Sequence, residues 1–184
     1  MPHRSFWLEV TGESFRPVHV TNSTLHITRA TTRDYARCSS CWSAVGKGFW
    51  TARSRWTAAR WRRHLGAQSV TFCLATHGGE DVGFFELQAR PRGARMEGFG
   101  LAPKWRGRGL GAILLSVATR WAFEHGARRV YLHTATDDHP HAMPNYTRRG
   151  YRVFRERELI RHMPASDQRS ALPPNTALER TRER

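Results

Sequence analysis

The sequence has no long hydrophobic run and few cysteines. No segment approaches the roughly 20 apolar residues that a membrane-spanning helix requires, and the first ten residues, MPHRSFWLEV, lack the apolar core of a signal peptide. Three cysteines, an odd number, do not make a disulfide framework. We therefore expect a protein of the reducing cytoplasm that has no membrane segment.

Two of the cysteines, Cys38 and Cys41, form a C-x-x-C pair, which could be redox-active or supply half of a zinc site. Two more ligands at a suitable spacing are lacking, and the third thiol, Cys73, lies alone in a strand-like run. We interpret the pair as two small buried residues on one helix face.

Acidic residues are also scarce: 15 Asp and Glu accompany 30 Lys and Arg, a formal net charge of +15. This charge predicts affinity for anions, either small acidic molecules or nucleic acid. On a helical wheel of residues 53–65, Arg53, Trp56, Arg60 and Arg63 share one side. Basic residues interleaved with aromatics can contact nucleic acid, but a solvated helix face is the commoner reason for such a stripe. The stripe assigned to the core consists of Ala58, Trp61 and Leu65.

The length predicts one domain with a substantial core. Residues 1–24 carry one short apolar run, and we interpret them as an extended N-terminal arm lying on the domain. The domain itself is predicted to span residues 25–164. Residues 165–184 lose apolar periodicity and end in alternating arginine and glutamate, which predicts a flexible basic tail.

Apolar periodicity and turn residues predict an α/β fold with a mixed, mainly antiparallel sheet of six to seven strands flanked by helices. Strands separated by short polar turns form antiparallel hairpins. The strand that follows the long helix lies where a crossover makes it parallel to the strand before that helix. The predicted strands are residues 25–29, 70–75, 82–87, 96–101, 130–133 and 151–154. The predicted helices are residues 31–43, 53–65, 110–125 and a short one that opens at Pro140.

A turn rich in glycine and arginine connects the strand at 96–101 to the helix at 110–125. Glycines at a helix start allow a phosphate to approach the backbone, where free N–H groups bind it. Arginines add charge-assisted hydrogen bonds to such an anion. The turn consists of Arg106, Gly107, Arg108, Gly109, Leu110 and Gly111. It is therefore predicted to cradle an anion, with an ordinary strand–helix turn as the alternative.

The spacing of the glycines separates three kinds of phosphate-binding turn. A Walker A loop needs Lys followed by Ser or Thr after its last glycine, and the dinucleotide fingerprint needs G-x-G-x-x-G; neither is present. The pattern Arg/Gln-x-x-Gly-x-Gly is present, in Arg106, Gly109 and Gly111. It resembles the pyrophosphate-binding motif of the GNAT superfamily of acetyl-CoA-dependent N-acetyltransferases. The resemblance extends over about residues 25–160.

A second motif supports the resemblance. Ala142, Tyr146, Gly150 and Tyr151 match the pattern Ala-x-x-x-Tyr-x-x-x-Gly-aromatic found near the C-terminus of many members. In that family the tyrosine lies close to the CoA sulfur and is the usual general acid, because a phenol can protonate a departing thiolate. Without the glycine motif, Tyr146 would be an ordinary half-buried aromatic residue.

The runs Phe-Gly-Leu-x-Pro at 99–103 and His-Thr-x-Thr-x-Asp-His-Pro at 133–140 resemble one bacterial subgroup of the family. The motif does not reveal the acceptor of that subgroup. His139 stands where many members have asparagine, and a neutral imidazole still offers one donor or acceptor to the pantetheine arm.

The segment 133–141 also contains the residue types of a metal site. Pro140 opens a helix within it, however, and the family pattern already uses these residues, so no metal is expected. A contribution of His133 or Asp138 to the acceptor pocket is the preferred interpretation.

The resemblance implies a GNAT fold whose sheet splays between the fourth and fifth predicted strands. It also implies that the pyrophosphate of acetyl-CoA rests on the glycine turn and that pantetheine pairs with the backbone of the preceding strand. The implied cofactor-binding residues are Phe99, Gly100, Leu101, Arg106, Gly107, Arg108, Gly109, Leu110, Gly111, His139 and Tyr146.

A general base is needed because an amine is mostly protonated at neutral pH. GNAT enzymes often use a glutamate on the strand before the glycine motif, commonly through water. Glu97 occupies that strand and Glu86 the neighbouring one. Either could instead bind a cationic acceptor or face solvent, so the base stays open between them, with Glu97 preferred.

We therefore expect an N-acetyltransferase that acetylates a primary amine of a small molecule, as a monomer or homodimer. Two alternatives stay open. One is an acyltransferase that acts on RNA or on a nucleic-acid-associated protein, suggested by the charge. The other is a CoA-binding module without turnover.

Overall fold

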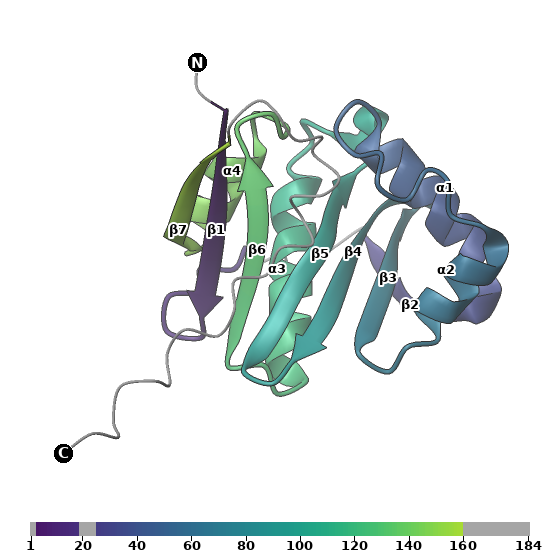
Figure 1. The fold of residues 1–184 in the computed structure, drawn as a ribbon, viewed down its shortest axis with the longest axis horizontal. Coiled ribbons are helices and arrows are strands. Elements are labelled where there is room, and N and C mark those ends of the chain that lie inside the picture. The colour runs from purple at the N-terminus through teal and green to yellow at the C-terminus, as the bar shows by residue number, and fades with distance from the viewer. Residues whose placement is uncertain (1–2, 19–24, 160–184) are drawn as a thin grey trace.

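The computed structural model describes residues 3–18 and 25–159. They form one seven-stranded sheet in the order β2-β3-β4-β5-β6-β1-β7 (Figure 1). The strands are β1 His3–Thr11, β2 His26–Arg29, β3 Val70–His77, β4 Glu80–Arg90, β5 Gly93–Leu101, β6 Arg129–Ala135 and β7 Arg152–Leu159. The helices are α1 Tyr35–Gly46, α2 Ala58–Leu65, α3 Leu110–Glu124 and α4 Ala142–Arg148. No helix among these residues is long and apolar enough to cross a bilayer.

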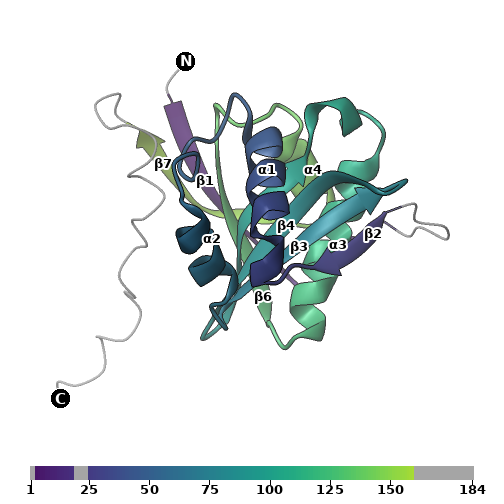
Figure 2. The ribbon, with the colours of Figure 1, turned by 90° about the vertical axis from the view of Figure 1, so that its right-hand side faces the viewer.

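Helices cover both faces of the sheet, with α1 and α2 on one side and α3 on the other (Figure 2). The sheet packs against helices on both faces because neighbouring residues of a strand point to opposite faces. On β3, Phe72 and Leu74 join the core under α1 and α2, whereas Cys73 and Ala75 join the core under α3. A strand buried on both faces reads as an unbroken apolar run, as residues 72–75 of β3 do.

The sheet is antiparallel except between β5 and β6, which are joined by α3. This confirms the predicted crossover. The parallel ladder is short, running from Ala94↔Val130 to Met96↔Leu132, although β5 continues to Leu101. The two strands therefore diverge beyond Met96, which is the predicted splay.

The N-terminal segment differs from its prediction. Residues 3–11 are not an arm on the surface, because β1 lies inside the sheet, antiparallel to both β6 and β7. Trp7 and Leu8 are adjacent and both buried, so the apolar run at residues 6–8 interrupts the alternation that marks a half-buried strand. Its partners lie more than 100 residues away, which gives no local signal. The predicted tail at 165–184 lies outside the described residues.

Side-chain caps mark the start of the short 3-10 turn that leads into α1 and the start of α2. Thr31 and Asp34 form a capping box before α1, which ends at Gly46 rather than near residue 43. The hydroxyl of Thr57 accepts from Arg60 N, so α2 begins at Ala58 and not near residue 53. Trp61 and Leu65 are buried, as predicted. The residues before Thr57, including Arg53, are therefore not on a helix face.

The cysteines are free and buried, which confirms that Cys38 and Cys41 are packing residues of α1. Burial raises the pKa of Cys38, Cys41 and Cys73 to about 12. At neutral pH these thiols stay protonated, and a protonated thiol is neither a nucleophile nor a metal ligand.

Candidate active site

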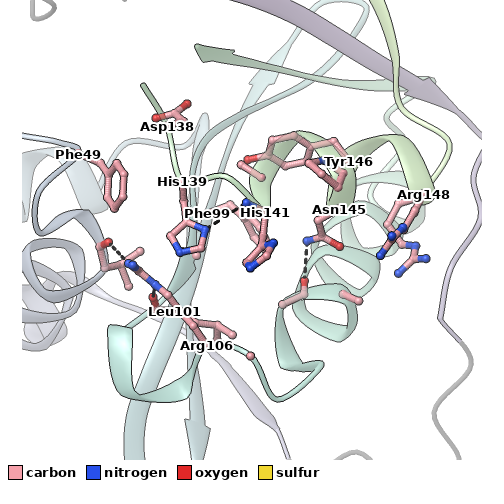
Figure 3. A pocket seen from close by; sticks show the side chains of 18 of the residues that line it. Phe49, Phe99, Leu101, Arg106, Asp138, His139, His141, Asn145, Tyr146 and Arg148 are labelled. Carbon is pink, nitrogen blue, oxygen red and sulfur yellow. Dashed lines mark hydrogen bonds between the residues drawn. The ribbon is translucent and has the colours of Figure 1, made fainter. Parts of the chain in front are cut away.

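A cavity of about 430 Å³ lies where β5 and β6 diverge (Figure 3). Five segments surround it: the connection after α1, the end of β5, the glycine turn, the connection between β6 and α4, and α4 itself. The predicted cofactor-binding residues that line it are Phe99, Gly100, Leu101, Arg106, Gly107, Gly109, Gly111, His139 and Tyr146. Two others, Arg108 and Leu110, belong to the turn but do not line the cavity.

The glycine turn leaves space in front of its backbone. Gly107 and Gly109 have φ angles of +77° and +76°, which strain any residue with a Cβ. A Cβ built at either position would meet no described atom within 4 Å, and within the described residues no side chain caps α3. The backbone N–H groups at the start of this 15-residue helix are thus accessible to an anion. These features fit a pyrophosphate.

Arg106 has a structural role in addition to lining the cavity. Its Nε donates to the carbonyl oxygen of Leu101 at 3.0 Å, and a terminal nitrogen donates to that of Val45 at 2.9 Å. The side chain therefore ties the glycine turn to the ends of β5 and α1. Arg108 is exposed, and its guanidinium lies 4.9 Å from the ring centre of Trp105.

The end of β5 presents backbone to the cavity. Phe99 and Leu101 pair with Phe85 and Gly83 of β4 along one edge. The ladder to β6 along the other edge has already ended at Met96 in the described sheet. Backbone groups on that edge can therefore pair with an extended ligand, in the way that a further strand would.

Tyr146 lies in α4 and is held in place from several sides. Its ring is centred 6.2 Å from Phe99 and 5.9 Å from Tyr151, and its hydroxyl is directed toward the side of His139 (Figure 3). The buried hydroxyl of Tyr151 hydrogen-bonds Thr119 Oγ1 of α3 at 2.7 Å. Asn145 Nδ2 donates to the Gly111 carbonyl at 3.2 Å. These two bonds tie α4 and Tyr151, three residues after its end, to the helix that begins at the glycine turn.

The ring of His139 lines the cavity with a defined tautomer. The backbone N–H of His141 donates to His139 Nδ1 at 3.3 Å, so Nε2 carries the proton of the neutral ring. Burial, followed by the charges of Arg106 and His141, lowers the pKa of His139. At neutral pH the ring is therefore neutral and can donate one hydrogen bond from Nε2.

Glu86 does not reach the cavity, and this corrects its prediction as a catalytic base. It is fully buried between α2 and the connection that precedes it. Arg53 donates to both carboxylate oxygens, at 2.9 Å for Oε1, and His64 Nε2 lies 2.9 Å from Oε1. Burial acts to raise the pKa of Glu86, but the His64 hydrogen bond and the Arg53 charge outweigh it and lower the pKa. The carboxylate is thus a structural ion-pair partner.

Glu97 lies beside the cavity wall rather than on it. It is the extra residue of a β-bulge, because Gly98 pairs with Glu86 while Met96 pairs with Leu87. Its carboxylate lies 3.2 Å from Arg95 Nε. Burial raises the pKa of Glu97 in spite of the Arg95 charge. Its predicted role as the base stays a prediction.

The cavity lining includes one of the two residues anticipated for the acceptor pocket, together with several residues that were not predicted from the sequence. Asp138 was anticipated, and its Oδ2 accepts hydrogen bonds from Thr134 Oγ1 at 2.7 Å and from Ala135 N at 3.1 Å. His133, anticipated with it, instead contacts Trp7 and does not line the cavity. The unpredicted residues include Phe49, Trp50, Asn145, Arg148 and Arg149. Of these residues, only Asn145 could have been suspected from the sequence, because it directly precedes Tyr146. The described residues contain no cluster of His, Cys, Asp or Glu that could hold a metal.

Replacing Glu86 with Gln is expected to lower the free energy of unfolding by about 3 kcal/mol, because Arg53 would lose its buried counter-charge. The pKa of Glu86 is lower in the folded state than the ordinary glutamate value of about 4.3. The ionised carboxylate therefore stabilises the fold fully above that value, and this stabilisation is lost as the pH falls below it. Urea unfolding at pH 7 and below pH 4 should show the difference shrinking in acid.

The matched control for this variant is Glu9→Gln. Glu9 pairs with Arg129, and the two side chains are 31% and 39% exposed. Such a pair contributes about 1 kcal/mol or less. Equal losses in the two variants would contradict a structural role for Glu86.

Known proteins were compared with this site and fold. Comparison with curated sequences gave no significant match. Among solved structures, a GCN5-related N-acetyltransferase from Sphaerobacter thermophilus is 18% identical with a TM-score of 0.68, covering 84% of this chain and 50% of that one. A putative acetyltransferase from Novosphingobium aromaticivorans is 18% identical with a TM-score of 0.59, covering 84% and 61%. The chain thus spans about half to three fifths of those proteins.

A third structure is closer in length. It is an aminoglycoside acetyltransferase from an uncultured soil metagenomic sample, 22% identical with a TM-score of 0.60, and the match covers 77% of this chain and 99% of that one. At these identities the likeness shows a shared fold. The family model described as acetyltransferase (GNAT) matches residues 31–151, which include the glycine turn, the splay and Tyr146. The chain therefore belongs to the acetyltransferase (GNAT) family.

Proposed function

We propose that the protein transfers an acetyl group from acetyl-CoA to a primary amine of a small molecule. The observation that carries this proposal is the open glycine turn at the start of α3, which borders the same cavity as Tyr146. One cavity thus combines backbone N–H groups that can bind an anion with a phenol that can donate a proton.

Separate parts of the cavity suit separate parts of acetyl-CoA, which supplies an acetyl group activated as a thioester. The N–H groups at the glycine turn would bind the pyrophosphate. The free edge of β5 at Phe99 would pair with the pantetheine amides. Arg148, at the far side of the cavity in Figure 3, is suited to a further phosphate.

The reaction requires two proton movements. The neutral amine attacks the thioester carbonyl, a C–N bond forms, and the C–S bond breaks. Tyr146 would give its phenolic proton to the departing sulfur, so CoA leaves as a thiol, and the tyrosine regains a proton from solvent. The proton of the amine would pass through water to Glu97. His139 can donate a hydrogen bond from Nε2 to an oxygen in the cavity.

The proposal is tested by two measurements on the full chain. Calorimetry should detect acetyl-CoA binding, and a thiol-detecting assay should show CoA release that depends on an added amine. Mass spectrometry of the amine should then show one acetyl group. Binding without release for a broad panel of amines would favour a CoA-binding module.

The role of Glu97 predicts a pH effect. The raised pKa of Glu97 means that its basic form is lost at a higher pH than usual as pH falls. The pH–rate profile should therefore have an acid limb that Glu97→Gln removes. Turnover at pH 8 should fall about 10-fold, less than a directly positioned base would give, since Glu97 acts through water. Glu156→Gln on β7, where Glu156 pairs with Arg4, should leave the profile unchanged.

A further inference from the structure

The two sides of the cavity differ in chemistry. Figure 3 shows Phe49 at one side and Arg148 at the other, with His139 and Tyr146 between them. If the phosphates of acetyl-CoA lie at the glycine turn and toward Arg148, the side of Phe49 is left for the acceptor. The class of acceptor can therefore be inferred from the residues on that side.

The side of the cavity at Phe49 is aromatic, and contacts within the protein hold it in place. Phe49 and Trp50 line it, and both backbone N–H groups donate to the Gly46 carbonyl at 2.8 Å. The Trp50 ring packs edge-on against Phe84 at 6.1 Å and lies close to Gly46, where a Cβ would come within 2.9 Å. The Phe49 ring is centred 5.8 Å from His139. These contacts hold an aromatic surface in position before any ligand binds.

The connection that carries these aromatics is also anchored to the sheet. Arg53, seven residues after Gly46, reaches the buried carboxylate of Glu86. Its guanidinium lies 4.7 Å from the ring centre of Trp56 and 5.7 Å from that of Trp61. The carboxylate of Glu86 is therefore paired with Arg53, which holds the connection in place, and it is not available to bind a ligand.

Negative charge is almost absent from the cavity itself. Asp138 is the one acidic residue among the described residues that line it, and its Oδ2 already accepts two hydrogen bonds. Glu97 is paired with Arg95. The cationic lining residues are Arg106, Arg148 and Arg149. A polycation would find no available carboxylate among the described lining residues to pair with its additional ammonium groups.

We infer that the acceptor is a monoamine with an aromatic body, an arylalkylamine, and not a polycationic amine. This rests on the proposed function and names its substrate class. The ring of the acceptor packs on Phe49 and Trp50, which burial of aromatic surface stabilises. The amine nitrogen forms the C–N bond as the C–S bond breaks, CoA leaves as the thiol, and the proton that the amine loses passes through water to Glu97 and from there to solvent.

The test compares three amines as acceptors: 2-phenylethylamine, ethylamine and the polycation kanamycin. We expect kcat/KM for 2-phenylethylamine to exceed that for ethylamine by about 10²-fold, because the ring adds buried apolar surface. Kanamycin should be acetylated more slowly than 2-phenylethylamine by at least that factor. Equal values for the three amines, or a preference for kanamycin, would overturn the inference and leave the proposed function standing.

A pair of matched variants assigns the preference to the aromatic side. Phe49→Ala should raise KM for 2-phenylethylamine about 10-fold while the calorimetric affinity for acetyl-CoA stays the same. Phe49→Leu, which keeps an apolar side chain, should retain most of the affinity. Phe154→Ala removes a 45% exposed phenylalanine on β7 and should change neither quantity. An unchanged KM in Phe49→Ala would contradict the inference.

If no amine releases CoA thiol although acetyl-CoA binds, the proposed function fails, and binding then decides the inference. Saturation-transfer NMR on the CoA-saturated protein should detect 2-phenylethylamine in the wild type and not in Phe49→Ala. Absence of that signal in the wild type would overturn the inference as well.

Discussion

Replacing Gly109 with aspartate is expected to abolish acetyl-CoA binding while the protein stays folded. The added carboxylate would lie in the open space before α3, where the pyrophosphate is proposed to bind, and like charges at contact disfavour binding by several kcal/mol. The dissociation constant should rise by about 10³-fold or more. Calorimetry on the purified variant measures this directly, and circular dichroism checks the fold.

The same helix offers the matched control. Gly126 lies just past the C-terminal end of α3, with a φ angle of +88° and no described atom within 4 Å of an added Cβ. Gly126→Asp therefore introduces the same backbone strain, of about 1–3 kcal/mol, and the same charge far from the cavity. Its affinity for acetyl-CoA should equal that of the wild type. Normal affinity in Gly109→Asp would mean that the glycine turn does not bind the cofactor.

Replacing Tyr146 with phenylalanine is expected to lower kcat by about 10²-fold or more, because the departing sulfur would lose its proton donor. The KM for acetyl-CoA should change little, since the ring still packs against Phe99. Steady-state kinetics with a saturating amine separate the two quantities. Wild-type turnover would show that Tyr146 only packs.

Tyr151→Phe is the control for this loss of a phenol. Its hydroxyl is buried against Thr119 and outside the cavity lining. Removing it should reduce the free energy of unfolding by about 1 kcal/mol and leave kcat close to wild type. A large loss of turnover in both variants would indicate a general disturbance of α4 rather than proton transfer by Tyr146.

The glycine turn could be predicted because all of its information is local. Glycines at fixed offsets from an arginine, a strand before them and an amphipathic helix after them lie within 30 residues. The backbone angles of Gly107 and Gly109 follow from residue type, since other residues rarely adopt them. The crossover from β5 through α3 to β6 follows from chain geometry.

The roles of charged side chains could not be predicted in this way. The position of Glu86 on a strand near the glycine motif suggested a catalytic base. Arg53 and His64, which lie 33 and 22 residues away in the sequence, pair with it instead. The sequence pattern places Arg53 on a basic helix stripe, but Thr57 caps α2, so the helix begins after Arg53. An ion pair forms between side chains that are close in space. When the two residues lie on different segments, their separation in the sequence does not indicate this closeness.

The sequence by itself determined the family resemblance, most of the strands and helices, and the glycine-rich turn before α3, because each depends on short-range patterns of glycine and apolar residues. Only the tertiary structure decided that β1 lies inside the sheet, that Glu86 is a structural ion-pair partner, and that Phe49 and Trp50 form one side of the cavity. Those features arise from contacts between distant segments. Burial, which sets the pKa of a carboxylate and the chemistry of a cavity, is a property of the whole fold.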